Sequence, residues 1–399
     1  YGETFMLDAG GSRRSIFTTN PDLIQYVLQK NHKNYEKSEI QTDQLGKYIG
    51  YGLLTNSGSH WLRQRRLIQP GFHRKRMESL TVEMQRTIEQ HCTDLDANIT
   101  SGEPIEIQKF TLQLTFRIIA RAIFTDGFSY DQMEELDDAM TDIQSFIIYP
   151  IRLPFLRPVV KTLGYEKKYV DLSEAIGNQM LERVNERRNG GEPKDDLLQM
   201  LIDSRYEDDG QPMEDKQMID EIMILFAAGH ETSANALAWT IYLLDQYPDV
   251  KKKVRQEINE QLGTDEAPTM EKLRNLPYLT AMLEESMRLY PPAWISDRVA
   301  LEDDEFEGVK IPKGMVVVPY FYGLHRSEDL YDDPEAFKPE RMLAEEKKKR
   351  HSYSFLPFGG GPRMCVGFHF AMLEMQLAMI YLLRNYEFTF MGDAKPEPK

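Results

Sequence analysis

The sequence predicts a mainly α-helical fold with small β-sheets. Most of the middle of the chain repeats apolar residues at spacings of three and four with charged residues between them, which is typical of amphipathic helices. Alternation of apolar and polar residues, which indicates strands, is confined to residues 5–19 and 296–320.

The elements of the first half follow from these patterns. FMLDAGGSRRSIFTT reads as two short strands joined by a glycine turn, and PDLIQYVLQKN reads as a short helix. The spacing then predicts amphipathic helices over 80–98, 105–124, 131–149 and 166–188. Three prolines in IIYPIRLPFLRPVV, residues 147–160, predict a mobile apolar connection between two of these helices.

The second half begins with the longest helix. Residues 215–247 are apolar on most sides, so we expect a helix that crosses the core. A helix over 276–290 should end at Pro291 and Pro292. Strands are expected within 296–320, with GVKIPKG as a turn, followed by a last helix over 366–385.

Composition restricts the class of protein. The chain has 399 residues, a net charge of −16 and 41% hydrophobic residues, which indicates a globular protein and argues against nucleic-acid binding. No repeat or linker divides it, so we expect one domain over 1–399, and a monomer. Two distant cysteines exclude a disulfide framework, and no membrane span or signal segment is present. We therefore expect a cytoplasmic location.

One cysteine has surroundings suited to a metal ligand. Cys365 lies in FGGGPRMCVG, where the glycines allow a tight turn with inward amides and a helix start follows. These features stabilise a thiolate. A single thiolate cannot satisfy zinc, so the ligand should bring its own remaining donors, and haem is the candidate. The alternative is a buried structural cysteine, which is how we interpret Cys92.

The stretch resembles the haem-binding signature F-x-x-G-x-R-x-C-x-G of the cytochrome P450 family at Phe358, Gly361, Arg363, Cys365 and Gly367. The resemblance implies the P450 fold and haem b, held non-covalently apart from a bond between iron and the Cys365 thiolate. It further implies that Phe358 packs against the sulfur and that Arg363 binds a haem propionate.

The long helix carries AGHETS, which is similar to the family's oxygen-binding motif. By this resemblance Ala228 and Gly229 permit close approach of the haem, Thr232 offers a hydroxyl to bound dioxygen, and Glu231 relays protons. His230 is not needed as a ligand. The haem should then lie between this helix and the cysteine loop with the last helix.

Further residues match other family positions. Trp61 and Arg65, in a W-x-x-x-R pattern, and Arg298 resemble residues that contact the haem propionates. Three others resemble the family's structural E-x-x-R pair with its later arginine, namely Glu285, Arg288 and Arg341.

The resemblance implies a monooxygenase that activates dioxygen with two electrons from a separate protein and hydroxylates a hydrophobic molecule such as a lipid, fatty acid, terpenoid or carotenoid. The alternatives are a peroxide-using P450 and a non-catalytic haem sensor or carrier. Leu225, Ala228 and Trp294 are candidate pocket walls, with plain core packing as the alternative. Substrate should enter between 147–160 and 40–55.

The electron donor is expected to be a ferredoxin, a flavodoxin-like protein or a reductase. It should dock on a basic face near Arg63–Arg66 and Lys347–Arg350, although such runs are equally typical of solvated surfaces. The family's lead-in helix and terminal strands are missing from the sequence, so trimming at both ends is expected, and no reductase is fused.

Overall fold

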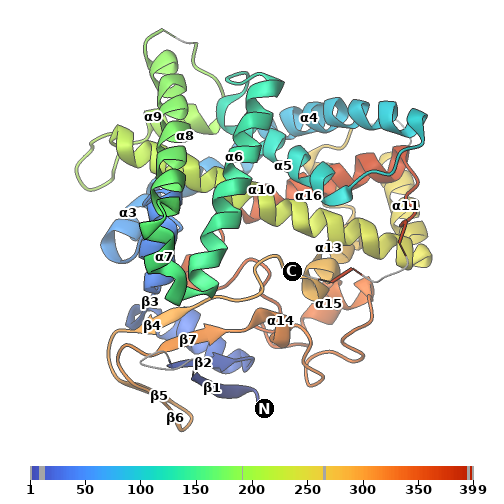
Figure 1. Cartoon of the computed structure of the whole chain (residues 1–399). Coiled ribbons are helices and arrows are strands. Elements are labelled where there is room, and N and C mark those ends of the chain that lie inside the picture. The colour runs from blue at the N-terminus through green and yellow to red at the C-terminus, as the bar shows by residue number, and fades with distance from the viewer. Residues whose placement is uncertain (1, 9–13, 191, 264–266, 393–395, 398–399) are drawn as a thin grey trace. The chain divides into compact units, whose positions relative to one another are not determined.

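The computed structural model describes residues 2–8, 14–190, 192–263, 267–392 and 396–397. They are mainly helical with small sheets, which confirms the predicted fold class (Figure 1). The chain forms two compact units that interleave along the sequence. The first contains Tyr1–Glu36, Ile88–Thr111 and Thr232–Lys399, and the second contains Lys37–Thr87 and Leu112–Glu231.

The first unit contains a five-stranded sheet. Its strands lie in the order β1 (Thr4–Asp8), β2 (Arg14–Thr18), β7 (Val316–Pro319), β4 (Arg298–Ala300) and β3 (Tyr35–Glu36). The β2–β7 pair is parallel and the other pairs are antiparallel. The sheet thus joins the start of the chain to the strands predicted within 296–320.

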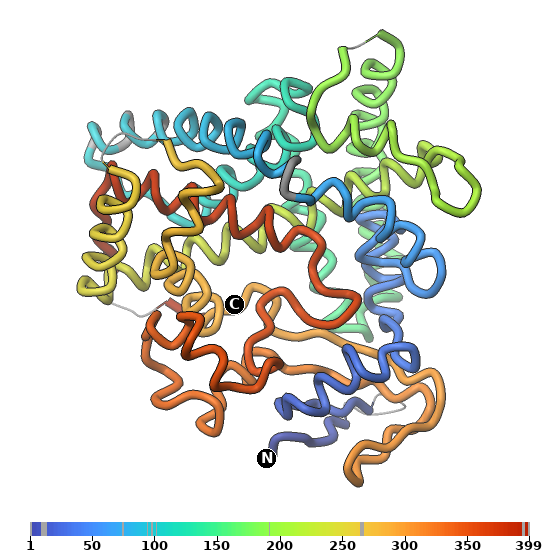
Figure 2. Tube along the Cα trace, turned by 180° about the vertical axis from the view of Figure 1, so that it is seen from behind, coloured from blue at the N-terminus to red at the C-terminus, as the bar shows by residue number. Residues whose placement is uncertain are grey.

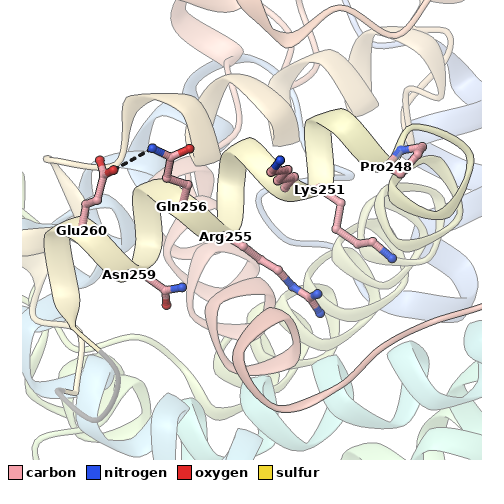
Figure 3. Close-up of a pocket in the computed structure, with 7 residues that line it drawn as sticks. Pro248, Lys251, Arg255, Gln256, Asn259 and Glu260 are labelled. Carbon is pink, nitrogen blue, oxygen red and sulfur yellow. Dashed lines mark hydrogen bonds between the residues drawn. The ribbon is translucent and has the colours of Figure 1, made fainter.

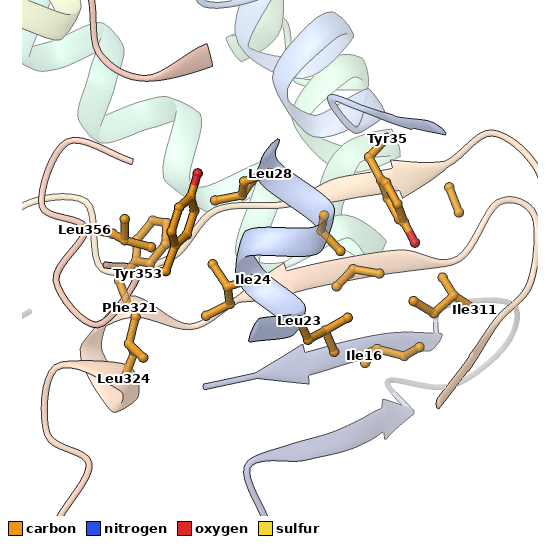
Figure 4. Close-up of a cluster of buried hydrophobic side chains, with 13 residues drawn as sticks. Ile16, Leu23, Ile24, Leu28, Tyr35, Ile311, Phe321, Leu324, Tyr353 and Leu356 are labelled. Atoms are coloured by element: carbon orange, nitrogen blue, oxygen red, sulfur yellow. The ribbon is translucent and has the colours of Figure 1, made fainter. Parts of the chain in front are cut away.

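A hydrophobic cluster packs against this sheet. The helix α1 (Pro21–Gln25) and the π-helix η1 (Tyr26–Lys30) supply Leu23, Ile24 and Leu28. Figure 4 shows these side chains beside Tyr353 and Leu356, which precede the cysteine loop. Burial of this apolar surface fixes the base of the loop against the N-terminal segment.

The structure corrects the prediction that GVKIPKG is a turn. Val309–Ile311 form strand β6, which pairs with β5 (Asp304–Phe306). Glu307 and Gly308, with φ angles of 47° and 84°, make the turn, as a tight hairpin requires. Ile311 is buried while Lys310 is exposed, so the stretch follows strand alternation. Within GVKIPKG, only the two ends, at Gly308 and at Lys313–Gly314, lie in turns.

The first unit also holds the C-terminal helices. The helix α13 (Pro277–Leu289) packs against α16 (Phe368–Asn385) and against the 3-10 turn η6 (Pro339–Met342) (Figure 2). The remaining helices of this region are α11 (Pro248–Leu262), α12 (Met270–Leu273), α14 (Phe321–Leu324), α15 (Ala344–Lys347) and the 3-10 turn η7 (Gly361–Arg363).

The second unit is helical. It contains the π-helix η3 (Ile40–Leu45), α2 (Gly46–Ile49), α3 (Gly58–Ile68), η4 (Gln69–Phe72), α6 (Tyr130–Arg152), η5 (Pro154–Leu156), α7 (Arg157–Thr162), α8 (Tyr165–Arg188) and α9 (Leu197–Asp203). Three long helices pass through both units: α4 (Arg74–Ser101), α5 (Ile107–Phe124) and α10 (Asp215–Gln246). The helices predicted from periodicity are all present.

The stretch 147–160, expected to be a mobile apolar connection between two helices, is itself mostly helical. Pro150 lies inside α6, within its last turn. Pro154 and Pro158 lie in the first turns of η5 and α7, where a missing N–H costs no hydrogen bond. Among the described residues, no helix combines the length and the apolar character that a membrane span requires.

Candidate functional site

The cysteine loop is a tight turn closed by a backbone hydrogen bond. The Cys365 amide donates to the Phe358 carbonyl across 2.9 Å. Gly367 is the N-cap residue of α16, so the loop leads directly into the positive end of that helix. The Phe358 ring meets Phe368 edge-on at 4.8 Å. The Cys365 thiol is exposed and forms no disulfide, whereas Cys92 is buried.

Gly361 is the most constrained residue of this loop. Its φ angle is 68°, and a Cβ atom here would overlap the carbonyl group of Leu28 in η1. Gly359 has a similar φ angle of 71° but open space around it. Gly361 therefore combines a left-handed backbone with close approach to another segment, and no larger residue meets both demands.

Buried Arg298 and half-buried Arg363 come together in the first unit. Arg298, at the start of β4, is 8% exposed and donates to the Asp297 carbonyl at 2.6 Å. Burial, reinforced by the charge of Arg363, lowers the pKa of Arg298 to about 10. The Arg363 guanidinium lies 3.9 Å from the Glu36 carboxylate, and the Asp297 charge partly offsets the lowering of the Arg298 pKa. Two neighbouring guanidinium groups suit a dianionic ligand such as a pair of carboxylates.

The helix α10 is buried along most of its length but opens on one side. Residues 221–227 are all buried, whereas Ala228 and Thr232, four positions apart on one face, are exposed. Leu225, a candidate pocket wall, is 9% exposed. An exposed small residue and a hydroxyl on an otherwise apolar helix mark the surface where a ligand could lie.

The residues between these two positions have internal partners. Gln144 of α6 donates to the Glu231 carboxylate at 3.0 Å, and burial raises the pKa of Glu231. His230 is fully buried, with its Nδ1 3.1 Å from the Phe226 carbonyl oxygen. A Cβ at Gly229 would lie 3.3 Å from Ile119, so this small residue serves the packing of α5 against α10.

Trp61 and Arg65 lie one turn apart on α3 in the second unit. Trp61 is buried and Arg65 half-buried, with its Nε donating to Gln69 at 3.1 Å. Trp294, in the first unit, is 48% exposed and meets Tyr320 edge-on. The structure thus gives Trp61 the burial expected of a core residue, and leaves Trp294 at the surface of its unit.

Glu285, Arg288 and Arg341 form one ion network. Glu285 and Arg288 are fully buried and joined by two hydrogen bonds of 2.8 and 2.9 Å. Arg341 lies 3.1 Å from the Glu285 carboxylate. Arg288 also donates to backbone carbonyls of His325, Pro334 and Ala336. The network therefore holds the chain between α14 and η6 against α13.

The two basic runs are locally compensated. Arg63 pairs with Asp208 and Asp209, and Arg66 with Glu207. In the other run Lys347 pairs with Glu284, and the next two lysines pair with Glu345 and Glu346. Much of the positive charge that the sequence suggested is thus neutralised within each unit.

Two surface grooves lie among the described residues. One, of about 470 Å³, follows α11 and is lined by Lys251, Arg255 and Asn259 among others (Figure 3). The other, of about 600 Å³, runs along α3 and includes Arg63 and Arg66. The lining of neither groove includes a residue of the cysteine loop.

No sequence pattern indicated several of the residues that contact the candidate site residues. Glu36, Leu28 and Gln144 act through contacts across long stretches of sequence, which no local spacing indicates. Glu221 is a further case. Its buried carboxylate accepts the Leu53 amide at 2.8 Å, and burial raises its pKa to about 7. It anchors part of the 40–55 segment to α10.

Comparison with known proteins places the chain in a family. The family model described as Cytochrome P450 matches residues 1–399. The chain is 30% identical to the protein LUTEIN DEFICIENT 5, chloroplastic, of Arabidopsis thaliana, over 99% of this chain and 69% of that protein. It is also 30% identical to cyclooctat-9-en-7-ol 5-monooxygenase of Streptomyces melanosporofaciens, over 92% and 78%.

A third relative is the cytokinin hydroxylase of Arabidopsis thaliana, which is 30% identical over 100% of this chain and 78% of that protein. These similarities extend over nearly the whole chain, including the cysteine loop and α10. The chain belongs to the cytochrome P450 family and is a monooxygenase, an oxidoreductase.

Proposed function

We propose that Cys365 binds the iron of haem b and that the enzyme hydroxylates an apolar small molecule with dioxygen and two electrons from a separate protein. The observation that carries this proposal is the pair of neighbouring arginines, Arg298 and Arg363, in the same unit as the cysteine loop. Haem brings two propionates, so its charge matches that of the pair. When bound, haem supplies the oxygen chemistry.

The protein's own residues would hold this group and deliver protons. The positive end of α16 and the loop amides stabilise Cys365 as a thiolate. From the second unit, Trp61 and Arg65 are proposed as further propionate contacts, and Ala228 as the small residue against the ring. Phe358, Gly361, Gly367 and Gly229 complete the set of residues proposed to hold the haem.

Proton delivery is assigned to α10. Thr232 is exposed on the open face of the helix. Glu231 has a pKa raised by burial, so it is better suited to exchange protons near neutral pH than an ordinary carboxylate. Gln144 holds its carboxylate in place. This pair supports the dioxygen route over the peroxide route.

The haem ligand can be tested directly. The purified holoprotein should show the strongly red-shifted Soret band of a thiolate-bound haem when it is reduced and treated with carbon monoxide. Cys365→Ala should lose that band, while the matched variant Cys92→Ala should keep it. An unchanged spectrum in Cys365→Ala would refute the assignment.

The route of oxygen activation has its own test. Thr232→Ala should consume reduced donor and dioxygen while forming less hydroxylated product, whereas peroxide-driven turnover should change little. Unaltered coupling in the variant would favour the peroxide-using alternative. A protein that binds haem and ligands but forms no product with any electron source would instead be a sensor or carrier.

Docking of the electron donor near Arg63–Arg66 and Lys347–Arg350 remains a proposal. The local ion pairs weaken the support for it, because paired cations attract an acidic partner less strongly. Arg66→Glu combined with Lys348→Glu should slow reduction by the donor and leave peroxide-driven turnover intact. Equal loss of both activities would count against this docking site.

A cytoplasmic location and a monomeric state also stay predictions.

For the substrate we propose an apolar molecule of the lipid or terpenoid class. The support is the apolar character of α10 around Leu225 and the activity in the name of one relative, cyclooctat-9-en-7-ol 5-monooxygenase. Terpenoid alcohols, carotenoids and fatty acids should be titrated into the holoprotein, followed by product analysis of those that shift the iron spin state. Shifts by none of these classes would refute the assignment.

A further inference from the structure

Asp304 accepts hydrogen bonds from several side chains of one distant segment. It is half-buried at the start of β5, which forms a hairpin with β6. Its Oδ1 accepts the Tyr26 hydroxyl at 3.0 Å, and its Oδ2 accepts the Asn31 side-chain amide at 2.9 Å. Oδ2 also accepts the hydroxyl of Tyr35 at 2.8 Å. Tyr35, labelled in Figure 4, is only 1% exposed. One carboxylate thus binds residues far apart from it in sequence.

These bonds suit an ionised carboxylate. Every partner of Asp304 donates, including the Glu305 backbone amide at 2.9 Å and the Asn34 side-chain amide at 3.5 Å. A carboxylate has about four lone pairs and no proton, so its two oxygens can accept from such a set. Burial alone would raise the pKa of Asp304, but hydrogen bonds from Tyr35, Glu305 and Tyr26 lower it overall. An asparagine would offer one oxygen in place of two and turn an NH₂ group toward these donors.

The donors belong to residues 26–36, called the 26–36 segment below, which also contacts the cysteine loop. Leu28 places its carbonyl group where a Cβ atom at Gly361 would overlap it. Glu36 has its carboxylate 3.9 Å from the Arg363 guanidinium. The residues that bind Asp304 flank the first of these contacts and directly precede the second. Both contacts hold η7, the 3-10 turn just before the cysteine.

The regular structure of the 26–36 segment is short. Its strand β3 contains two residues and its π-helix η1 contains five. π-helical turns are rare in proteins and occur frequently at functional sites. The side-chain hydrogen bonds to Asp304 therefore contribute to the placement of a segment that has few backbone hydrogen bonds of its own.

We propose that Asp304 is a positioning residue for the haem site and acts on η7 through the 26–36 segment. Its hydrogen bonds fix the two residues of the segment that contact η7. They thereby fix the direction of Arg363 toward a haem propionate and the placement of the Cys365 thiolate. This role rests on the proposed function, because it concerns the haem that Cys365 is proposed to bind.

Asp304→Asn and Asp303→Asn form a matched pair for the test. Asp303 is the preceding acid, is exposed, and accepts the Lys313 backbone amide at 2.8 Å. Haem release from the purified ferric holoprotein would be followed by transfer to excess apomyoglobin. Asp304→Asn should release haem about tenfold faster than wild type, on the scale of one lost hydrogen bond to a charged group. Asp303→Asn should release it at nearly the wild-type rate.

A second readout separates positioning from stability. Far below the unfolding temperature, the fraction of total haem that gives the red-shifted band after reduction and addition of carbon monoxide should fall in Asp304→Asn. A role in stability alone would leave this fraction unchanged. Tyr35→Phe removes one donor, so it should shift both readouts in the same direction by a smaller amount. It decides the question if Asp304→Asn does not fold.

The outcomes that refute the proposal are distinct. If Asp304→Asn lowers only the unfolding midpoint, with haem release and the carbon monoxide band unchanged, Asp304 does not position the haem site. Unchanged haem release in Tyr35→Phe would lead to the same conclusion. A wild type without the red-shifted band refutes the proposed function of Cys365, and the role of Asp304 with it. A normal wild-type band with equal haem release from the two aspartate variants refutes only the role of Asp304.

Discussion

At the scale of single residues, the glycines of the cysteine loop differ in what they do. Gly359 and Gly361 both have positive φ angles, but only Gly361 lies against another segment. The family signature resembled by this sequence fixes a glycine at 361 and leaves 359 open. The structure supplies a physical reason for that difference. The sequence motif alone does not supply one.

Alanine substitutions should separate the two effects. Gly359→Ala should cost about 1–2 kcal/mol of stability, from the left-handed backbone alone. Gly361→Ala should cost more and should also weaken haem retention, because its Cβ would displace the Leu28 carbonyl. Thermal unfolding and the Soret absorbance per protein would measure both. Equal effects of the two substitutions would show that the contact with Leu28 is unimportant.

Glu374, on α16, is a buried carboxyl group that no sequence pattern indicated. It is fully buried, and neither carboxylate oxygen accepts a hydrogen bond of ordinary geometry from the described residues. Burial raises its pKa from 4.5 to about 8, and the nearby Ser233 hydroxyl offsets this only in part. At neutral pH the folded protein therefore keeps this group protonated.

This pKa shift predicts a pH-dependent stability. Between pH 4.5 and 8 the unfolded chain releases the Glu374 proton while the folded protein retains it. This group's contribution to stability is thus fully present below pH 4.5 and is lost as pH rises toward 8. Glu374→Gln should gain stability relative to wild type at pH 8 compared with pH 5, as measured by chemical unfolding of the holoprotein. A difference independent of pH would contradict the raised pKa.

At the scale of elements, the α13 network links a helix to the irregular chain that follows α14. Arg288 donates to three backbone carbonyls between residues 325 and 336 and to Glu285. These carbonyls belong to residues outside the described helices and strands, and the buried guanidinium hydrogen-bonds them. The i, i+3 spacing predicted the Glu285–Arg288 pair, but the carbonyls could not be predicted from sequence.

Removing the guanidinium should be strongly destabilising. Arg288→Met leaves the Glu285 charge buried without its main partner, which typically costs about 3–5 kcal/mol. Lys313→Met is the control, since its ion pair with Glu302 is exposed on both sides, and it should change the unfolding midpoint little. A similar midpoint shift in both variants would mean that the network adds no more than a surface pair.

Periodicity predicted the long helices well because their apolar faces repeat over many turns. Periodicity did not predict the helical turns within 147–160 or the strand within 308–314, because both stretches are short and rich in proline or glycine. In the first, prolines start helical turns instead of ending them. In the second, Glu307 and Gly308, both with positive φ, form a turn at the start of the stretch, and strand β6 follows it. Local composition does not distinguish these outcomes.

At the scale of the whole molecule, the candidate residues were predictable and their surroundings were not. Cys365, Arg363, Arg298 and Thr232 follow from motifs. Their electrostatic setting, such as the proximity of Arg298 to Arg363, depends on how β4 and the cysteine loop meet in the folded chain. One family model spans residues 1–399, while the structure has two compact units. A single cooperative domain therefore remains a prediction.

Removal of haem should reveal how far the fold depends on it. A ligand that binds only the folded state stabilises it, by about 4 kcal/mol when free haem exceeds its Kd about 1,000-fold. Relief of the repulsion between Arg298 and Arg363 is one source of that affinity. The apoprotein should thus unfold at a lower temperature than the holoprotein in calorimetry. Cys365→Ala should reduce the difference between the unfolding temperatures of holoprotein and apoprotein. Cys92→Ala, a substitution at a buried position, should lower both temperatures and leave their difference unchanged. Identical midpoints with and without haem would contradict a site built around the two arginines.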